Sequence, residues 1–342
     1  MKKKISVALF TFFFLFIGGT SFSIAGSLPS KNADRMKQHS NASSKKNTVK
    51  LPNVFFTKNL SSEGLMAVYK ALGRKAEGKV AVKISTGEPG GNNYLHPELI
   101  KDFVQSVNGT IVECNTAYGG KRSSTASHKQ VTIDHGFTEI APVDIMDEDG
   151  EMELPIKNGR HLNVNYVGSH LANYDSLLIL SHFKGHQMGG FGGALKNISI
   201  GIASTKGKIW IHTAGSTNKT DAGDVFFSTP QDSFLESMAE AASSIIDYRK
   251  DSIVFINVMR DLSIDCDCNA HPKDPEMKDI GILASLDPVA LDQACVDLVY
   301  KSADPGKASL IQRMEEKHGI HTVEEAARLG VGSRDYELID ID

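Results

Sequence analysis

The chain has no excess of basic residues and no apolar segment long enough to span a bilayer. Its 342 residues include 37 Lys and Arg against 41 Asp and Glu, and the first 25 residues contain three lysines and no acid. Without that segment the balance is 34 against 41, a net charge of −7. This negative charge gives no support to nucleic-acid binding. The one long apolar run, residues 5–18, is shorter than the ~20 residues that a transmembrane helix needs.

Two further absences concern the route of export. No cysteine stands at the expected cleavage point, which argues against a lipoprotein, and no twin arginine is present, which favours the Sec route. The N-terminus otherwise has the three parts of a signal peptide, with lysines at 2–4, the apolar run, and small residues at 23–25. We therefore expect cleavage near Ala25 and a periplasmic or secreted protein with no stable membrane span. An uncleaved N-terminal anchor is the alternative.

The amino-acid composition divides the chain into three segments. Residues 1–25 are the expected signal peptide. Residues 26–50 are rich in Ser, Asn and Lys and cannot bury enough apolar surface to offset the entropy of ordering, so we expect a flexible polar spacer. Residues 51–342 are long enough for one large domain or for two lobes that share a core.

Short aliphatic runs alternate with helical patterns along residues 51–342. We expect strands at 80–84, 110–113, 176–180 and 252–256. We expect helices at 63–72, 97–107, 234–248, 288–300 and 307–318. This alternation predicts an α/β fold with a mainly parallel sheet and helices on both faces. In such sheets, ligands bind beyond the carboxyl ends of the strands.

Polar and thiol side chains follow each expected strand. The first strand leads into a glycine-rich loop at 86–91, and the second ends at Glu113 and Cys114. The third ends at His182, and the fourth leads towards Cys266. We therefore expect Cys114, His182, His186 and Cys266 to lie in one crevice.

Residues 182–197 (HFKGHQMGGFGGALKN) have the highest density of reactive groups in the chain. Histidine can move protons or bind a transition metal near neutral pH, and lysine can bind an anion or act as a base. The candidate catalytic residues are His182, His186, Lys184 and Lys196. Glycines let a ligand approach the main chain, so the candidate cofactor-binding residues are Gly189, Gly190, Gly192, Gly193 and Asn197. The alternative is a loop whose glycines only make turns. The spacing excludes a GxxxxGK[ST] phosphate loop.

Cys266 and Cys268 are separated by one residue, and their thiolates could bind one soft metal ion. The candidate metal ligands are Cys266, Cys268, Cys114 and His186, for a transition metal of unknown identity. The alternative is a structural disulfide, natural in an oxidising compartment. Cysteines so close rarely pair with each other, so a disulfide would involve Cys114 or Cys295. Cys295 lies on an apolar helical face and is expected to be a buried free thiol.

These motifs resemble those of the family known as domain of unknown function 362, also described as iron–sulfur centre proteins. The resemblance rests on four stretches and covers roughly residue 51 to the C-terminus; the stretches are 181–186, 190–197, 266–268 and 279–292. It implies an α/β fold and a metal-linked or redox-linked role, and it brings no known reaction. Many relatives insert a ferredoxin-like module after the glycine-rich stretch, but residues 203–230 contain no cysteine. An iron–sulfur cluster is therefore disfavoured, and a single ion fits an exported protein better.

One shorter stretch is similar to a second family. His186 followed by Gly192, Gly193 and Lys196 is similar to a histidine–GlyGly–lysine stretch of lactate racemases, which use a nickel pincer cofactor. In that family the imidazole acts on a 2-hydroxy acid and the lysine anchors the cofactor.

Three hypotheses follow from the sequence. The chain could bind a metal or metal cofactor at a Cys/His site. It could instead be an enzyme for a small anionic substrate, with racemase-like acid–base chemistry. The third hypothesis is an exported scaffold stabilised by disulfides.

Overall fold

The computed structural model describes residues 50–342. The expected signal peptide and nearly all of the expected spacer lie outside the described residues, so export and processing stay predictions. Residues 50–342 pack as one unit rather than as two lobes. No helix in this range is long and apolar enough to cross a membrane.

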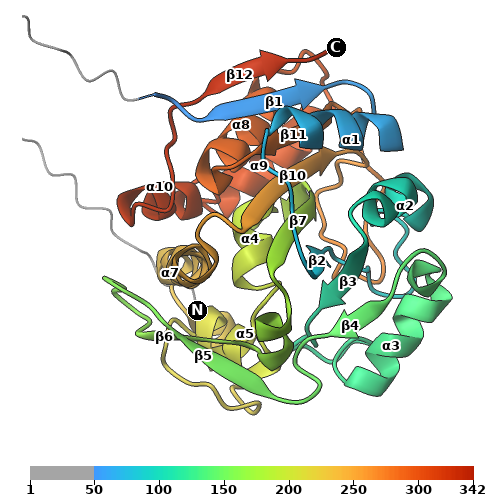
Figure 1. Cartoon of the computed structure of the whole chain (residues 1–342). Coiled ribbons are helices and arrows are strands. Elements are labelled where there is room, and N and C mark those ends of the chain that lie inside the picture. Colours follow the sequence, from blue (N-terminus) through green and yellow to red (C-terminus); the bar gives the residue numbers. More distant parts are fainter. Residues whose placement is uncertain (1–49) are drawn as a thin grey trace, which may run out of the picture. The chain divides into compact units, whose positions relative to one another are not determined.

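An eight-stranded sheet runs through the centre of this unit (Figure 1). In spatial order its strands are β12 (Glu337–Asp340), β1 (Asn53–Thr57), β11 (Gly281–Ser285), β10 (Ile253–Met259), β7 (Ser176–His182), β2 (Val80–Lys83), β3 (Gly109–Glu113) and β4 (Val143–Ile145). Every neighbouring pair is parallel except the two pairs that β11 makes with β1 and β10. The sheet is therefore mainly parallel, as the sequence predicts.

Helices cover both faces of the sheet, and the alternation of strand side chains explains why. In β7, Leu177 and Ile179 belong to a core that includes α4 (Ala194–Ser199), α7 (Gln231–Arg249) and α8 (Pro288–Lys301). Leu178 and Leu180 belong to the opposite core, with α1 (Ser62–Ala71) and α2 (Pro97–Ser106). A strand buried on both faces is apolar throughout, which is why these central strands are recognisable in the sequence. The α/β class with helices on both faces is confirmed.

The remaining elements surround this layered core. Two hairpins pair β5 (Glu151–Pro155) with β6 (Val164–Gly168), and β8 (Lys184–His186) with β9 (Gly190–Gly192). The other helices are α3 (Thr125–Asp134), α5 (Thr205–His212), α6 (Val225–Ser228), α9 (Lys307–Glu316) and α10 (His321–Arg328). All four strands and all five helices expected from the sequence are present, with bounds shifted by a few residues. The antiparallel β11 and the outer strands β1, β4 and β12 were not expected.

Candidate active site

A cavity lies where the strand order reverses. From β2 the chain places β3 and β4 on one side, and then β7 and β10 on the other. Ligands bind at such a reversal, outside the carboxyl ends of the strands. A cavity of about 310 Å³ opens there, lined by Lys83 of β2, Glu113 of β3, and Ser181 and His182 of β7. The fold therefore brings three separate strand ends to one hollow.

One side of the cavity, which we call the paired wall, consists of Lys83, Glu113 and Arg122. Glu113 accepts hydrogen bonds from Lys83 Nζ at 2.9 Å and from Arg122 Nη1 at 3.1 Å. The backbone N–H of Thr86 also donates to Glu113, at 2.8 Å, and Arg122 Nε donates to Glu88 at 3.1 Å. All five residues are at most 4% exposed. Every charge on the paired wall therefore has a buried partner of opposite sign.

The partners of Glu113 fix its charge. Burial acts to raise the pKa of this carboxyl, but the ammonium of Lys83 and the guanidinium of Arg122 outweigh burial and hold the pKa below its usual value. Glu113 is thus an anion at neutral pH. Its role is to hold the paired wall together rather than to transfer protons.

His182 and Lys184 are both tied to Asp267, the residue between the two neighbouring cysteines. Asp267 Oδ1 lies 2.9 Å from His182 Nδ1, and Oδ2 accepts a hydrogen bond from Lys184 Nζ at 2.7 Å. The other ring nitrogen of His182, Nε2, lies 2.6 Å from the carbonyl oxygen of Arg260. Because protein acceptors lie beside both ring nitrogens of His182, neither nitrogen is free for a ligand. His182 and Lys184 line the cavity but are bound to the segment that carries the cysteines.

His186, on β8, has one ring nitrogen free. Its Nδ1 accepts hydrogen bonds from the backbone N–H groups of Met188 and Gly189, at 3.2 and 2.9 Å. The proton of the neutral ring is therefore on Nε2, which has no hydrogen-bond partner within residues 50–342. Burial, followed by repulsion from Lys196, holds the pKa of His186 well below its ordinary value. His186 thus offers the cavity a neutral N–H donor.

His212, at the end of α5, has the complementary arrangement. Its ring is stacked between Phe226 and Phe234, at centroid distances of 4.5 and 4.8 Å. Nδ1 lies 2.7 Å from the carbonyl oxygen of Lys208 and must donate to it, which leaves the lone pair on Nε2. Burial lowers the pKa of His212 to about 4. His212 is therefore neutral at pH 7 and offers the cavity an acceptor.

Lys196, on α4, is the one predicted site residue whose charged group is wholly unpaired. Its Nζ makes no hydrogen bond or ion pair with any residue in the described part of the chain, and the side chain lines the cavity. Burial, followed by repulsion from Lys184, lowers the pKa of Lys196 to about 7. We call His186, Lys196 and His212 the open wall, because each has a polar atom that no protein group satisfies.

The predicted cofactor-binding residues divide into two groups. Gly192, Gly193 and Asn197 line the cavity. Gly189 and Gly190 do not; a Cβ on Gly190 would lie 2.8 Å from Cα of Gly319, so this glycine allows the β8–β9 hairpin to pack closely. The amide of Asn197 is already used. Its oxygen accepts from Lys83 Nζ, and its nitrogen donates to Ser181 Oγ at 3.0 Å and to the carbonyl oxygen of Lys83 at 3.3 Å.

The four cysteines differ from expectation in their pairing. The disulfide joins Cys266 to Cys268, whereas the sequence analysis expected any disulfide to involve Cys114 or Cys295. Those two are buried free thiols. The tight turn of the 266–268 segment, in which Asn269 N–H donates to the carbonyl oxygen of Cys266, brings the two Cα atoms to 5.2 Å, a separation that a disulfide can span.

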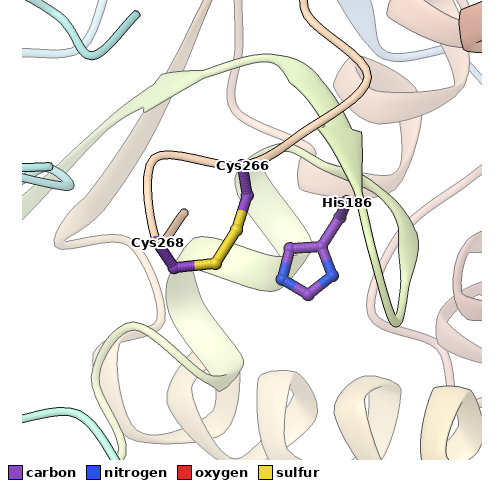
Figure 2. A group of neighbouring side chains, drawn as sticks. All are labelled: His186, Cys266 and Cys268. Atoms are coloured by element: carbon purple, nitrogen blue, oxygen red, sulfur yellow. A yellow bond between two sulfur atoms is a disulfide. The ribbon is translucent and has the colours of Figure 1, made fainter. Parts of the chain in front are cut away.

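The expected crevice is nevertheless formed. One donor atom from each of His186, Cys266 and Cys268 lies within 4.8 Å of the others, and Figure 2 shows the imidazole beside the disulfide. Cys114 also lines the cavity but lies outside that group of three. Its Sγ donates to the carbonyl oxygen of Ile202, and burial raises its pKa, so it is held as a thiol rather than as a thiolate ligand.

The cavity residues that the sequence does not predict include four with basic side chains: Lys83, Arg122, Lys208 and His212. Lys83 could have been found, because it is the only charged residue in an otherwise apolar strand. Arg122 and Lys208 belong to no recognisable motif. His212 lies sixteen residues beyond Lys196 in sequence, and only the packing of α5 brings it to the cavity.

No curated protein matches the chain significantly. One similar solved structure is the lactate racemase apoprotein from Thermoanaerobacterium thermosaccharolyticum, at 16% identity and a TM-score of 0.41, covering 72% of this chain and 56% of that one. Another is a protein from Thermotoga maritima, at 10% identity and a TM-score of 0.36, covering 78% and 58%. The chain thus spans less than three-fifths of either structure.

A family model gives the more direct result. Residues 80–297 match the model described as domain of unknown function DUF362. This range includes the strand ends, the glycine-rich segment, the disulfide and the whole open wall. The resemblance noted from the motifs is confirmed, and the chain belongs to the DUF362 family.

Proposed function

We propose that this chain is an enzyme that binds a small organic anion in the cavity, with His212 accepting a proton from the anion and His186 donating a hydrogen bond to it. The observation that carries the proposal is the unpaired ammonium of Lys196. Lys196 is half-buried in the cavity wall, and a partly desolvated charge without a partner is costly, so such a site is suited to a ligand of opposite charge.

The remaining charges of the cavity support an anionic ligand. Lys83, Arg122 and Lys184 are balanced by carboxylates. Lys208 has only a carbonyl partner, the oxygen of Ala203. Lys196 and Lys208 are therefore two cations that no carboxylate neutralises. A volume of about 310 Å³ is at the lower end for ligand pockets and suits a small carboxylic or phosphorylated acid.

The two histidines have different parts in this step. His212 Nε2 has the lone pair that can accept a proton from the bound anion and later return it, and the neutral His186 Nε2–H can donate a hydrogen bond to an oxygen on which negative charge develops. An anion bound beside Lys196 would raise the pKa of both imidazoles, because a nearby negative charge favours their protonated forms. Racemisation of a 2-hydroxy acid is one reaction that two such groups could perform.

The stretch similar to lactate racemases implies a nickel-containing organic cofactor. Lys196 fits the anchoring role, because its Nζ is unpaired and faces the cavity. A bound cofactor of this kind would supply an electron-accepting centre. The chain itself would hold the substrate anion through its free cations and the His186 N–H, and would accept the proton on His212.

Anion binding can be tested by calorimetric titration with lactate, oxalate and inorganic phosphate. We expect Lys196→Met to weaken binding by about 10- to 100-fold, the equivalent of losing one charge-assisted hydrogen bond of roughly 1.5–3 kcal/mol. The matched control is Lys206→Met, because Lys206 pairs with Glu151 outside the cavity. Equal affinity in wild type and Lys196→Met would contradict the proposal.

Proton transfer has its own measurement. Exchange of the Cα hydrogen of a 2-hydroxy acid in D₂O, followed by NMR with the holoprotein, should fall strongly in His212→Phe. Phenylalanine keeps the stack with Phe226 and Phe234, and it removes the Nε2 lone pair together with the Nδ1–H bond to the carbonyl oxygen of Lys208. Unchanged exchange in this variant would remove His212 from the reaction.

Metal binding is a second candidate function, and the group of His186, Cys266 and Cys268 favours it. The sulfurs must first be reduced, since only thiolates ligate well. In reduced protein, Zn²⁺ should raise the melting temperature and a chelator should lower it again. Cys268→Ser should abolish this response and Cys295→Ser should keep it, whereas equal responses in both variants would exclude the site.

Export is part of the same proposal, since it sets the compartment in which the enzyme works. The mature protein should begin near Gly26 and be recovered outside the cytoplasm. N-terminal sequencing that finds Met1 on the exported form would contradict it.

A further inference from the structure

The Cys266–Cys268 disulfide is reachable from the cavity on one side only. Cys268 lines the cavity and is partly exposed, whereas Cys266 is 1% exposed. A small nucleophile entering the cavity therefore meets the sulfur of Cys268 and not that of Cys266. A disulfide with only a structural role has no need of such access.

We propose that Cys266 and Cys268 form a reversible redox centre that exchanges with small anionic thiols entering through the cavity. A thiolate RS⁻ attacks Sγ of Cys268; the Cys266–Cys268 bond breaks, and Cys266 leaves as a thiolate that takes up a proton. A second thiol attacks the outer sulfur of the mixed disulfide, which releases RSSR and the thiolate of Cys268. The sum is protein disulfide plus two RSH giving protein dithiol plus RSSR, and the reverse reaction re-forms the disulfide.

The surroundings of the disulfide favour thiolates. His186 lies within 4.8 Å of the sulfurs and has an unpartnered Nε2–H. Lys184 is held next to them through its 2.7 Å bond to Asp267, and the unpaired Lys196 lines the same cavity. Positive charges and N–H donors stabilise an attacking or leaving thiolate. Because Asp267 neutralises Lys184, the unpaired Lys196 is the charge that favours entry of an anionic thiol.

The fold around the disulfide does not depend on the S–S bond. Between the two cysteines, Asp267 accepts a backbone hydrogen bond from Glu88 N–H at 2.8 Å and holds His182 and Lys184 through its carboxylate. The turn is further closed by the bond from Asn269 N–H to Cys266. These contacts remain when the sulfurs separate, so the dithiol form keeps the loop in place. The proposed exchange shares the cavity, His186 and Lys196 with the acid–base chemistry proposed above, but its test reads out the sulfurs and can therefore fail separately from that of the proposed function.

The test is alkylation followed by mass spectrometry on native protein exposed to three thiols: mercaptoacetate, 2-mercaptoethanol and cysteamine. We expect two cysteines, Cys266 and Cys268, to become alkylated, while the buried Cys114 and Cys295 stay unmodified until the protein is unfolded. Adding the oxidised form of the thiol should restore the disulfide. A disulfide that resists millimolar thiol in folded protein, or that opens only together with labelling of Cys114 and Cys295, would overturn the proposal.

The charge of the thiol tests the route of entry. Rates are expressed relative to those with a small-molecule disulfide, which removes intrinsic differences in reactivity. We expect mercaptoacetate to react at least ~10-fold faster than cysteamine at low salt, with the ratio shrinking as ionic strength rises. Lys196→Met should reduce that ratio, whereas Lys206→Met should leave it unchanged. Equal rates for the anionic and the cationic thiol would place the exchange outside the cavity and reject the proposal.

Discussion

Both walls of the cavity consist of ionisable side chains. These side chains are paired with one another on the paired wall and lack such partners on the open wall. On the paired wall, Lys83 and Arg122 share Glu113, and each donor has an acceptor at hydrogen-bond distance. On the open wall, Lys196 has no partner within residues 50–342, and His186 and His212 each keep one free ring nitrogen. The polar groups of the paired wall bond to one another, so this wall contributes shape and rigidity to the cavity. The free polar atoms of the open wall remain available to a ligand, so we expect the open wall to carry the chemistry.

The largest effect should come from breaking the paired wall. Glu113→Ala leaves the buried Lys83 without its anion and leaves Arg122 with Glu88 alone, and removing one partner of a buried pair costs about 3–5 kcal/mol. We expect that loss in the free energy of unfolding, measured by urea titration with the fluorescence of Trp210. The control is Glu148→Ala, which breaks a partly exposed pair with Lys129 and should cost less than about 1 kcal/mol. Equal losses in the two variants would mean that the paired wall does not stabilise the fold.

A smaller effect should separate two adjacent glycines that support the open wall. A Cβ on Gly193 would lie 2.3 Å from Asp292 Oδ1, and Asp292 accepts the N–H bonds of Ala194 and Leu195 that begin α4. A Cβ on Gly192 would meet only Cδ of Lys196, at 3.6 Å. Gly193→Ala should therefore lower the melting temperature and cost roughly 1–3 kcal/mol by overpacking.

Gly192→Ala is the matched control for that experiment. Its added methyl makes an ordinary contact with a flexible side chain, so the melting temperature should stay near that of the wild type. A larger loss of melting temperature in Gly192→Ala than in Gly193→Ala would contradict this expectation. Because the sequence analysis assigned both glycines to cofactor binding, this pair also separates a packing role from a ligand role.

The two walls also differ in how far the sequence predicts them. The carboxyl ends of the central strands are recognisable because those strands are apolar on both faces, and from them the convergence of His182, His186 and Cys266 follows. The hydrogen-bond partners of these side chains cannot be predicted in the same way. The sequence shows His182 and His186 as equivalent candidates, but Asp267 and a backbone carbonyl occupy the first, while two backbone N–H groups set the tautomer of the second.

Long-range packing explains what the sequence could not give. His212 reaches the cavity only because α5 packs against β6 and α7, and no local pattern encodes that contact. The pairing of Cys266 with Cys268 depends on a turn closed by backbone hydrogen bonds, which composition does not show. Asp292 lies in the 279–292 motif, but the sequence does not show its role. In the structure, Asp292 of α8 accepts the N–H bonds at the start of α4.

The last prediction concerns how steeply the free energy of unfolding changes with pH, and it tests the difference between the two walls at one residue, Lys196. The pKa of Lys196 is lowered from its ordinary value of 10.5 to about 7 in the folded protein, so between these values the unfolded chain holds a proton that the folded chain has released. Stability rises with pH wherever the unfolded state binds more protons, by at most about 1.4 kcal/mol per pH unit for one group. The free energy of unfolding should therefore rise more steeply from pH 7.5 to 9.5 in wild type than in Lys196→Met, and the two slopes should coincide below pH 7.

Lys206→Met should keep the wild-type slope, because the pKa of Lys206 is raised by Glu151 and this lysine stays protonated across the window. A bound anion should remove the difference, since it restores the charge on Lys196 in the folded state. Identical slopes for wild type and Lys196→Met in the absence of anions would show that Lys196 has found a partner, and the open wall would lose its central member.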